Sequence, residues 1–141
     1  MSPEQLVHRF VDAFNQRDLA GIEALYAQDA VSHVPEAPEP LKGRDAIVAV
    51  VPGIWTAFPD VRWELRQPVV ASGNQAAYEI ATQMTHDGPL PMPDGTTLEA
   101  TGKKLSDEVG VFLTLDDDGL IVEERAYHDF TAIAMELGLV G

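Results

Sequence analysis

One carboxylate lies where a predicted strand meets a predicted helix. Asp129 ends a strand-like run from Leu120 to Asp129, and the apolar segment from Phe130 to Leu139 follows directly. Side chains on a strand alternate between its two faces, so the residue types on each face follow from the sequence. The face predicted to carry Asp129 comprises Ile121, Glu123, Arg125, Tyr127 and Asp129. This pattern is typical of the wall of a polar-floored pocket, where a carboxylate can act as a general acid or base.

The other face of this strand is predicted to carry Val122, Glu124, Ala126 and His128. Neither face is purely apolar. A surface or dimer-interface role suits His128, because it is predicted to point away from Asp129. Glu123 fits the rim of a pocket. A simpler role stays open for Asp129, since Asp before a helix commonly accepts backbone N–H bonds as its N-cap.

Three further residues could contribute to the same chemistry. Asp107 is in phase with five apolar side chains of its strand, and burying an unpaired carboxylate costs several kcal/mol, so it is predicted to face a cavity or its rim. His86 is in phase with core residues, and a buried imidazole must find a partner. His33 lies near the end of a strand, at the mouth of the proline-rich loop 35–40.

Composition limits the classes of function. The chain has 141 residues, which favours one domain over residues 1–141. Lys and Arg number 9 against 23 Asp and Glu, and the net charge of −14 argues against binding nucleic acid or anionic lipid. With no cysteine, thiolate chemistry and disulfides are excluded. No apolar stretch approaches ~20 residues and no secretory signal is seen, so a cytoplasmic location is expected.

Helical periodicity dominates the first part of the chain. A first helix is predicted from Pro3 to about Gln16, with Ser2 and Gln5 forming a capping box. Asp18 is predicted to cap a short second helix. A third helix spans roughly Arg44 to Phe58, and Pro52 should kink it or split it in two.

The second part of the chain alternates with a period of two. Strands are predicted near 61–66, 76–86, 104–115 and 120–129, and a last helix from Thr131 to Leu139. A Pro- and Gly-rich excursion after His86 could fold over a pocket. Helices followed by an antiparallel meander predict an α+β fold rather than repeated βαβ units.

Several segments together resemble one family. They are Gly43 to Ile47, Ala57 to Leu65 with its Phe-Pro-Asp, Thr85-His-Asp-Gly88 with Ala100 to Lys103, and Asp118 to Glu124 followed by Asp129. Their order and spacing are similar to those of the SnoaL-like polyketide cyclases within the NTF2-like superfamily. The chain departs from that pattern at Arg125, where the family often has Trp, and at His128, where it often has an apolar residue.

The resemblance implies a conical, curved antiparallel sheet wrapped around the first helix, with an internal pocket, and commonly a homodimer. It implies that Asp129 is the acid or base of an intramolecular aldol-type cyclisation or a related isomerisation, without a cofactor or metal. His86 and His33 match histidines that line the cavity. The substrate would be a small hydrophobic or polyketide-like molecule.

Further residues are candidates for the pocket lining, and other functions stay open. Tyr127 could donate to Asp129. The large side chains that could line the pocket, or simply pack in the core, are Trp55, Trp63, Tyr78 and Met84. One alternative is an epoxide hydrolase resembling related members of the superfamily, with Asp107, Arg125 and Asp129 as an Asp-Arg-Asp set. A second is a non-catalytic ligand-binding domain. A third is a metal site formed by His33, His86 and Asp129.

Overall fold

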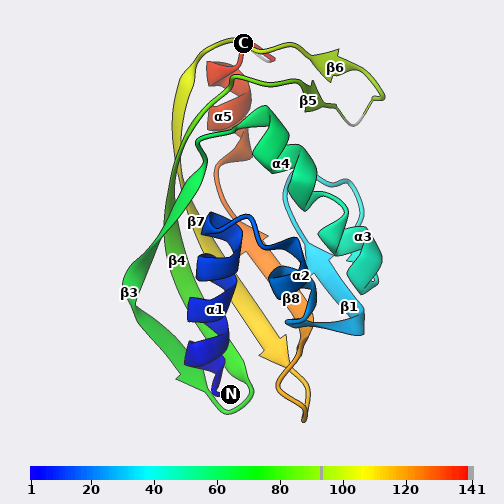
Figure 1. The fold of residues 1–141 in the computed structure, drawn as a ribbon, viewed down its shortest axis with the longest axis vertical. Coiled ribbons are helices and arrows are strands. Elements are labelled where there is room, and N and C mark those ends of the chain that lie inside the picture. Colours follow the sequence, from blue (N-terminus) through cyan, green and yellow to red (C-terminus); the bar gives the residue numbers. More distant parts are fainter. Residues whose placement is uncertain (93, 140–141) are drawn as a thin grey trace.

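The helices and strands follow the order expected of an α+β fold (Figure 1). A computed structural model describes residues 1–92 and 94–139. The elements are α1 (Pro3–Asn15), α2 (Leu19–Glu23), β1 (Tyr26–His33), β2 (Leu41–Lys42), α3 (Arg44–Val48), α4 (Val51–Ala57), β3 (Arg62–Ser72), β4 (Gln75–Thr85), β5 (Leu90–Pro91), β6 (Thr97–Leu98), β7 (Lys104–Leu115), β8 (Ile121–Tyr127) and α5 (Phe130–Glu136). Within these described residues, none of the helices combines the length and apolarity that crossing a bilayer requires.

Helix α1 begins and ends as the sequence predicts. Ser2 accepts from the backbone N–H of Gln5, and the Gln5 side chain accepts from the backbone N–H of Ser2, which completes the capping box. The buried stripe comprises Leu6, Val7, Phe10, Val11, Ala13 and Phe14. At its carboxyl end, the Asn15 side chain exchanges two hydrogen bonds of 2.8 and 2.9 Å with the backbone of Trp63, which ties α1 to β3.

The six main strands form one curved sheet in the order β2-β1-β8-β7-β4-β3 (Figure 1). Four of its five pairings are antiparallel, but β1 pairs with β8 in parallel, so the sheet is mixed rather than wholly antiparallel. Parallel neighbours need a long crossover, and everything from β2 to β7 supplies it. The first strand, β1, and the last strand, β8, thereby lie side by side.

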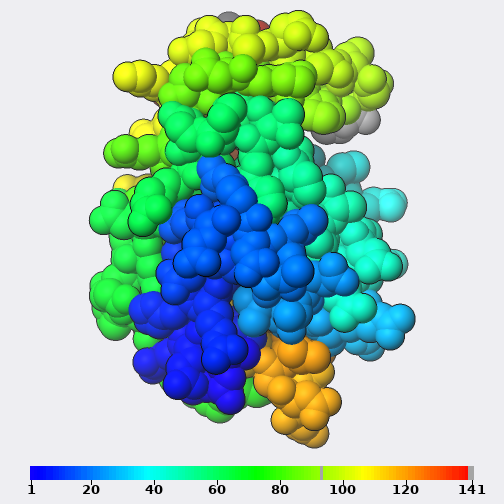
Figure 2. Space-filling model, viewed as in Figure 1, coloured from blue at the N-terminus to red at the C-terminus, as the bar shows by residue number. Residues whose placement is uncertain are grey.

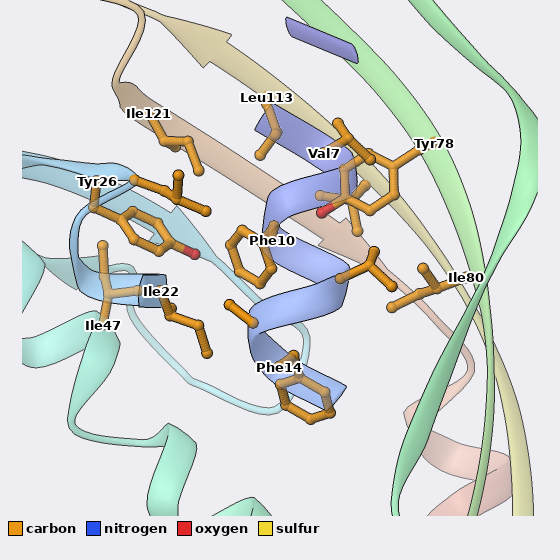
Figure 3. Packing of buried hydrophobic residues seen from close by; sticks show 14 of the residues in the cluster. Val7, Phe10, Phe14, Ile22, Tyr26, Ile47, Tyr78, Ile80, Leu113 and Ile121 are labelled. Atoms are coloured by element: carbon orange, nitrogen blue, oxygen red, sulfur yellow. The ribbon is translucent and has the colours of Figure 1, made fainter. Parts of the chain in front are cut away.

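The core fills the space between α1 and the inner face of the sheet (Figure 3). The Phe14 ring stacks on Trp63 with centroids 3.6 Å apart, and Phe10 packs between Trp63 and Tyr26 at 5.6 and 5.8 Å. Each fully buried side chain of this size contributes about 1.5–3 kcal/mol. Packing of these rings therefore holds the sheet against α1, in addition to the hydrogen bonds of Asn15.

The predicted third helix is split in two, as the proline indicates. Helix α3 ends at Val48, and α4 begins at Val51 with Pro52 in its first turn, where a missing N–H costs nothing. The segment after His86 then crosses the end of the cone against α4 (Figure 2). Asp87 and Gly88 both donate to the carbonyl of Ala57, and a Cβ at Gly88 would collide with the carbonyl oxygen of Thr56.

One extra residue in β8 reverses the predicted faces of that strand. Leu115 pairs with Ile121 and Thr114 pairs with Glu123, so Val122 is the unpaired residue of a β-bulge. Ile121 faces the core, but beyond the bulge the even-numbered residues face inward. The inner residues are Glu124, Ala126 and His128, whereas Glu123, Arg125 and Tyr127 face outward. The prediction that Asp129 shares an inner face with Arg125 and Tyr127 is therefore wrong.

The bulge also directs a carboxylate into the core. Glu124 accepts from the Tyr26 hydroxyl at 2.9 and 3.0 Å and from the Ser32 hydroxyl at 2.8 Å, across the parallel β1–β8 pair. Burial raises the pKa of Glu124, and the bonds from Ser32 and Tyr26 act in the opposite direction. The cluster satisfies three polar groups that could not otherwise be buried cheaply.

The Glu124 cluster can be tested through stability. Glu124→Ala should lower the free energy of unfolding by about 1–3 kcal/mol, because the hydroxyls of Tyr26 and Ser32 lose their acceptor. Glu124→Gln keeps an acceptor oxygen, so its free energy of unfolding should fall by clearly less. Urea unfolding at pH 7 measures both, and equal losses for the two variants would contradict the assignment.

Candidate active site

The inward turn of β8 brings a histidine between two carboxylates. His128 follows the last residue of β8, and its Nε2 lies 2.8 Å from Oε2 of Glu36, in the loop between β1 and β2. Its Nδ1 lies 2.9 Å from Oδ2 of Asp107 on β7. The side chains of His128 and Asp107 are only 13% and 12% exposed, whereas that of Glu36 is 43% exposed. Three segments far apart in the sequence thus meet at one imidazole.

The contacts of the two ring nitrogens favour one charge state of His128. Nε2–H donates to Glu36, while the Nδ1 contact is an ion pair whose angle falls short of a hydrogen bond, so Nδ1 lacks a hydrogen-bond acceptor within the described residues. In a neutral ring that donates through Nε2, the lone pair of Nδ1 would face an anionic oxygen. The repulsion is removed if both nitrogens carry protons. The arrangement therefore favours an imidazolium.

Titration behaviour agrees with this charge. The hydrogen bond to Glu36 raises the pKa of His128, partial burial lowers it, and the charges of Glu36 and Asp107 raise it further, with a net increase above 6.5. Burial pushes the pKa of Glu36 upward, but the hydrogen bond and charge of His128 outweigh it and hold that pKa below its ordinary value. For Asp107, burial prevails over the charge of His128, so its pKa is raised. Asp107 is the better base of the two carboxylates.

Asp107 also borders an open groove. The groove has a volume of about 430 Å³ and lies between α5 and strands β3, β4 and β7. Its lining includes Asp107, Thr82, Ile133 and, at the exposed start of α5, Asp129. A small molecule in this groove would reach the Asp107 carboxylate, which lines it and contacts His128 in turn. The groove with Asp107 and its partner His128 is therefore the candidate active site.

Asp129 itself lies at the surface as the N-cap of α5. Its Oδ1 accepts from the backbone N–H of Ala132 at 2.9 Å. This is the alternative that the sequence left open, and it accounts for the carboxylate without any catalytic role. Asp129 borders the groove, but the structure does not direct it into the interior.

His86 is completely buried and ties down the segment that crosses the cone. Its Nδ1 accepts from the backbone N–H of Thr101 at 3.3 Å and lies 2.9 Å from the Thr101 hydroxyl. Its own backbone bonds to Gly102 and Lys103, so both ends of the segment 87–103 meet there. The ring packs on Phe58 with centroids 5.6 Å apart, and Nε2 has no hydrogen-bond partner in the described part of the chain. Its contacts thus hold the fold, and its catalytic role stays a prediction.

Three predicted site residues lie on the outer face of the sheet. Arg125 pairs with Glu123 at 3.2 Å, and His33 approaches Glu123 at 3.7 Å. Tyr127 is 57% exposed and packs against Phe112. The structure therefore does not bring Arg125 to Asp107 and Asp129, and it separates His33 from His86, so neither the Asp-Arg-Asp set nor the proposed metal site is assembled.

The large apolar candidates belong to the core or its border. Tyr78 is buried, and Trp63, Trp55 and Met84 are partly buried against the core cluster. Trp55 lies 5.6 Å from the Phe14 ring. Packing explains these four positions, and their predicted role in binding a substrate stays untested.

Sequence reasoning missed His128, Glu36 and Glu124. The missing information was the bulge at Val122, because alternation by two has no place for an inserted residue. One signal was present: neither predicted face of β8 was purely apolar, as expected when a strand changes face partway along its length. Glu36 carried no such signal, since it reaches His128 from an irregular loop.

The pKa of His128 predicts a pH dependence of stability. Because the folded-state pKa lies above 6.5, the contribution of His128 is fully present below about pH 6.5 and is lost as the pH rises through the folded-state value. The free energy of unfolding of the wild type should therefore fall relative to that of His128→Gln across this range. Urea titrations from pH 6 to pH 9 measure the difference, and parallel curves for the two proteins would contradict it.

Solved structures share this fold over nearly the whole chain. AclR of Streptomyces galilaeus, described as a candidate hydroxylase, matches with a TM-score of 0.79 and 24% identity over 97% of this chain and 85% of its own. IdmH of Streptomyces antibioticus, described as a candidate polyketide cyclase, matches with a TM-score of 0.78 and 24% identity over 98% and 99%.

A third match comes from Jannaschia sp. CCS1 and is described as a candidate SnoaL-like polyketide cyclase. Its TM-score is 0.81, with 16% identity over 100% of this chain and 98% of its own. At these identities the matches establish the α+β cone. The SnoaL-like domain model matches residues 7–124, from within α1 to within β8, which is more than half of the chain. The chain therefore belongs to the SnoaL-like family.

Proposed function

We propose that this protein is a cofactor-independent acid/base enzyme of the cyclase type, with Asp107 as the proton-transferring group and His128 as its charged partner. The observation that carries the proposal is the Asp107 carboxylate, which is 12% exposed, borders the groove and lies 2.9 Å from His128 Nδ1. Asp107 replaces Asp129, the residue that the family resemblance implies. The type of reaction is supported by membership of the SnoaL-like family and by the similarity of the fold to structures described as candidate polyketide cyclases.

The proposed reaction is an aldol-type ring closure or a related isomerisation of a carbonyl compound. Asp107 removes a proton from the carbon next to a carbonyl, and the positive charge of His128 stabilises the enolate oxygen that results. The enolate carbon then bonds to a second carbonyl carbon of the same molecule. The proton held by Asp107 returns to the new alkoxide, so that no atom is gained or lost.

Desolvation makes the carboxylate suitable for this step. A carboxylate in water has a pKa near 4 and is a weak base, whereas burial raises the pKa of Asp107 towards that of a useful base. The imidazolium keeps the buried carboxylate ionised at rest. When Asp107 takes up the substrate proton, the negative charge moves to the enolate and remains close to His128.

Proton abstraction can be assayed without the natural substrate. In D₂O, the wild type should catalyse deuterium exchange at the α-carbon of members of a panel of aromatic ketones and β-keto esters, followed by proton NMR. Asp107→Asn should lower the exchange rate by about 10²- to 10⁴-fold while the protein stays folded. Asp129→Asn is the matched control, because it keeps a capping oxygen at α5, and should exchange like the wild type.

Three outcomes would contradict this assignment. Loss of exchange in Asp129→Asn but not in Asp107→Asn would restore the carboxylate that the family resemblance implies. If neither variant affects turnover of a substrate that the wild type converts, acid/base catalysis at this groove is excluded. Saturable ligand binding with no exchange in any variant would favour a non-catalytic binding domain.

We also propose that the chain forms a homodimer, and the outer face of the sheet is the surface that suits it. Val70, Phe112 and Tyr127 are 60%, 55% and 57% exposed around a hollow of about 650 Å³. Arg125 and Glu123 border the same hollow with opposite charges, so two copies of this face could complement each other.

The dimer proposal predicts that a charge on this face separates the protomers. Phe112→Lys should turn a dimer into a monomer, because it places an unpaired ammonium in a buried apolar interface. Light scattering after gel filtration measures the mass. A wild-type protein that is monomeric at about 100 μM would overturn the proposal, as would an unchanged dimer in the variant.

A further inference from the structure

The outer nitrogen of His128 is occupied by a group of the protein itself. Nε2–H donates to Oε2 of Glu36 at 2.8 Å. The acceptor is an anionic oxygen bonded to a trigonal carbon. A carboxylate oxygen or an enolate oxygen of a ligand has the same chemical character. Glu36 therefore displays the kind of atom that this N–H is able to hold.

The two carboxylates on His128 differ in how easily they could leave. The Asp107 side chain is 12% exposed, and its separation from His128 would strand two poorly hydrated charges. The Glu36 side chain is 43% exposed, so water can replace His128 as its partner when it leaves. Nδ1 thus has a fixed partner, whereas the partner of Nε2 is exchangeable.

The segment that carries Glu36 can move without disturbing the sheet. Glu36 lies in the loop between His33, the last residue of β1, and Leu41, the first residue of β2. The pairing of these strands involves residues 31–32 and 41–42, outside the loop. The groups that face the His128 ring are Glu36 from this loop, Asp107 from β7 and the Phe130 ring of α5. Of these three groups, Glu36 is the one that comes from an irregular segment.

We propose that Glu36 is a built-in occupant of the position that an anionic oxygen of the ligand takes on His128 Nε2. The ligand class is then a compound with a carboxylate or an enolisable carbonyl, and the loop 34–40 must release Glu36 before such a ligand binds. The proposal rests on the proposed function in one respect: it makes Nε2–H the donor that holds the enolate oxygen while Asp107 remains on Nδ1.

The test measures binding of benzoate, a simple carboxylate, by calorimetry at pH 7. Glu36→Gln removes the charge of the occupant at constant size and should bind benzoate at least about tenfold more tightly than the wild type, the magnitude of one charge-assisted hydrogen bond. Glu39→Gln is the matched control, since Glu39 is exposed in the same loop and loses the same net charge. It should bind like the wild type. Benzamide, which is neutral, should bind neither variant more tightly than it binds the wild type.

A double variant identifies the position of the ligand. Adding His128→Gln to Glu36→Gln should abolish the gain for benzoate. If Glu36→Gln does not fold, Glu36→Asp serves instead, because its shorter side chain retracts the carboxylate from Nε2 and should strengthen binding in the same direction. Unchanged affinity in the folded Glu36 variant, an equal gain in Glu39→Gln, or a gain that survives loss of His128 would each overturn the proposal. Binding is measured without turnover, so failure of the proposed function at Asp107 would be seen separately in the deuterium exchange assay.

Discussion

The inserted residue Val122 determines which side chains of β8 reach the interior. Without the bulge, Glu123 and Arg125 would lie on the same face as Ile121. Two charged side chains that are now in contact with solvent would then be in the core. With the bulge, Glu124 is partly buried against Tyr26 and Ser32, and His128 turns towards Asp107. A shift of one residue in register therefore decides whether Glu124 and His128 lie on the inner side of the sheet or in solvent.

The charged centre has one cation between two unequal anions. Contacts of 2.8 and 2.9 Å on opposite sides of the imidazole hold the ring in place. The net charge of −14 adds a background potential that favours the protonated ring. Burial raises the pKa of Asp107, whereas His128 holds the pKa of Glu36 below its ordinary value, so the inner carboxylate is the stronger base. The Glu36 side chain is also the more exposed of the two, at 43% against 12%, so the outer carboxylate is the easier to displace. This division gives each side of one histidine a different role.

Much of the fold could be predicted from local sequence. The capping box at Ser2, the division of the third helix at Pro52 and the bounds of β7 all depend on neighbours in the chain, and the structure confirms them. The parallel β1–β8 pair could not be predicted, because it joins segments about ninety residues apart. The candidate site was only partly predictable: Asp107 was identified because an acid among apolar residues is costly, but its partners depend on a bulge and on a loop that local patterns do not specify.

The candidate site depends on His128 facing inward as an imidazolium between Asp107 and Glu36. Proton–nitrogen correlation spectra of the histidine rings at pH 7 test it directly. Both ring nitrogens of His128 are expected to carry protons, as in an imidazolium, and this pattern should disappear when Asp107→Asn and Glu36→Gln are combined. A neutral ring with one protonated nitrogen, titrating near its ordinary value in the wild type, would contradict it.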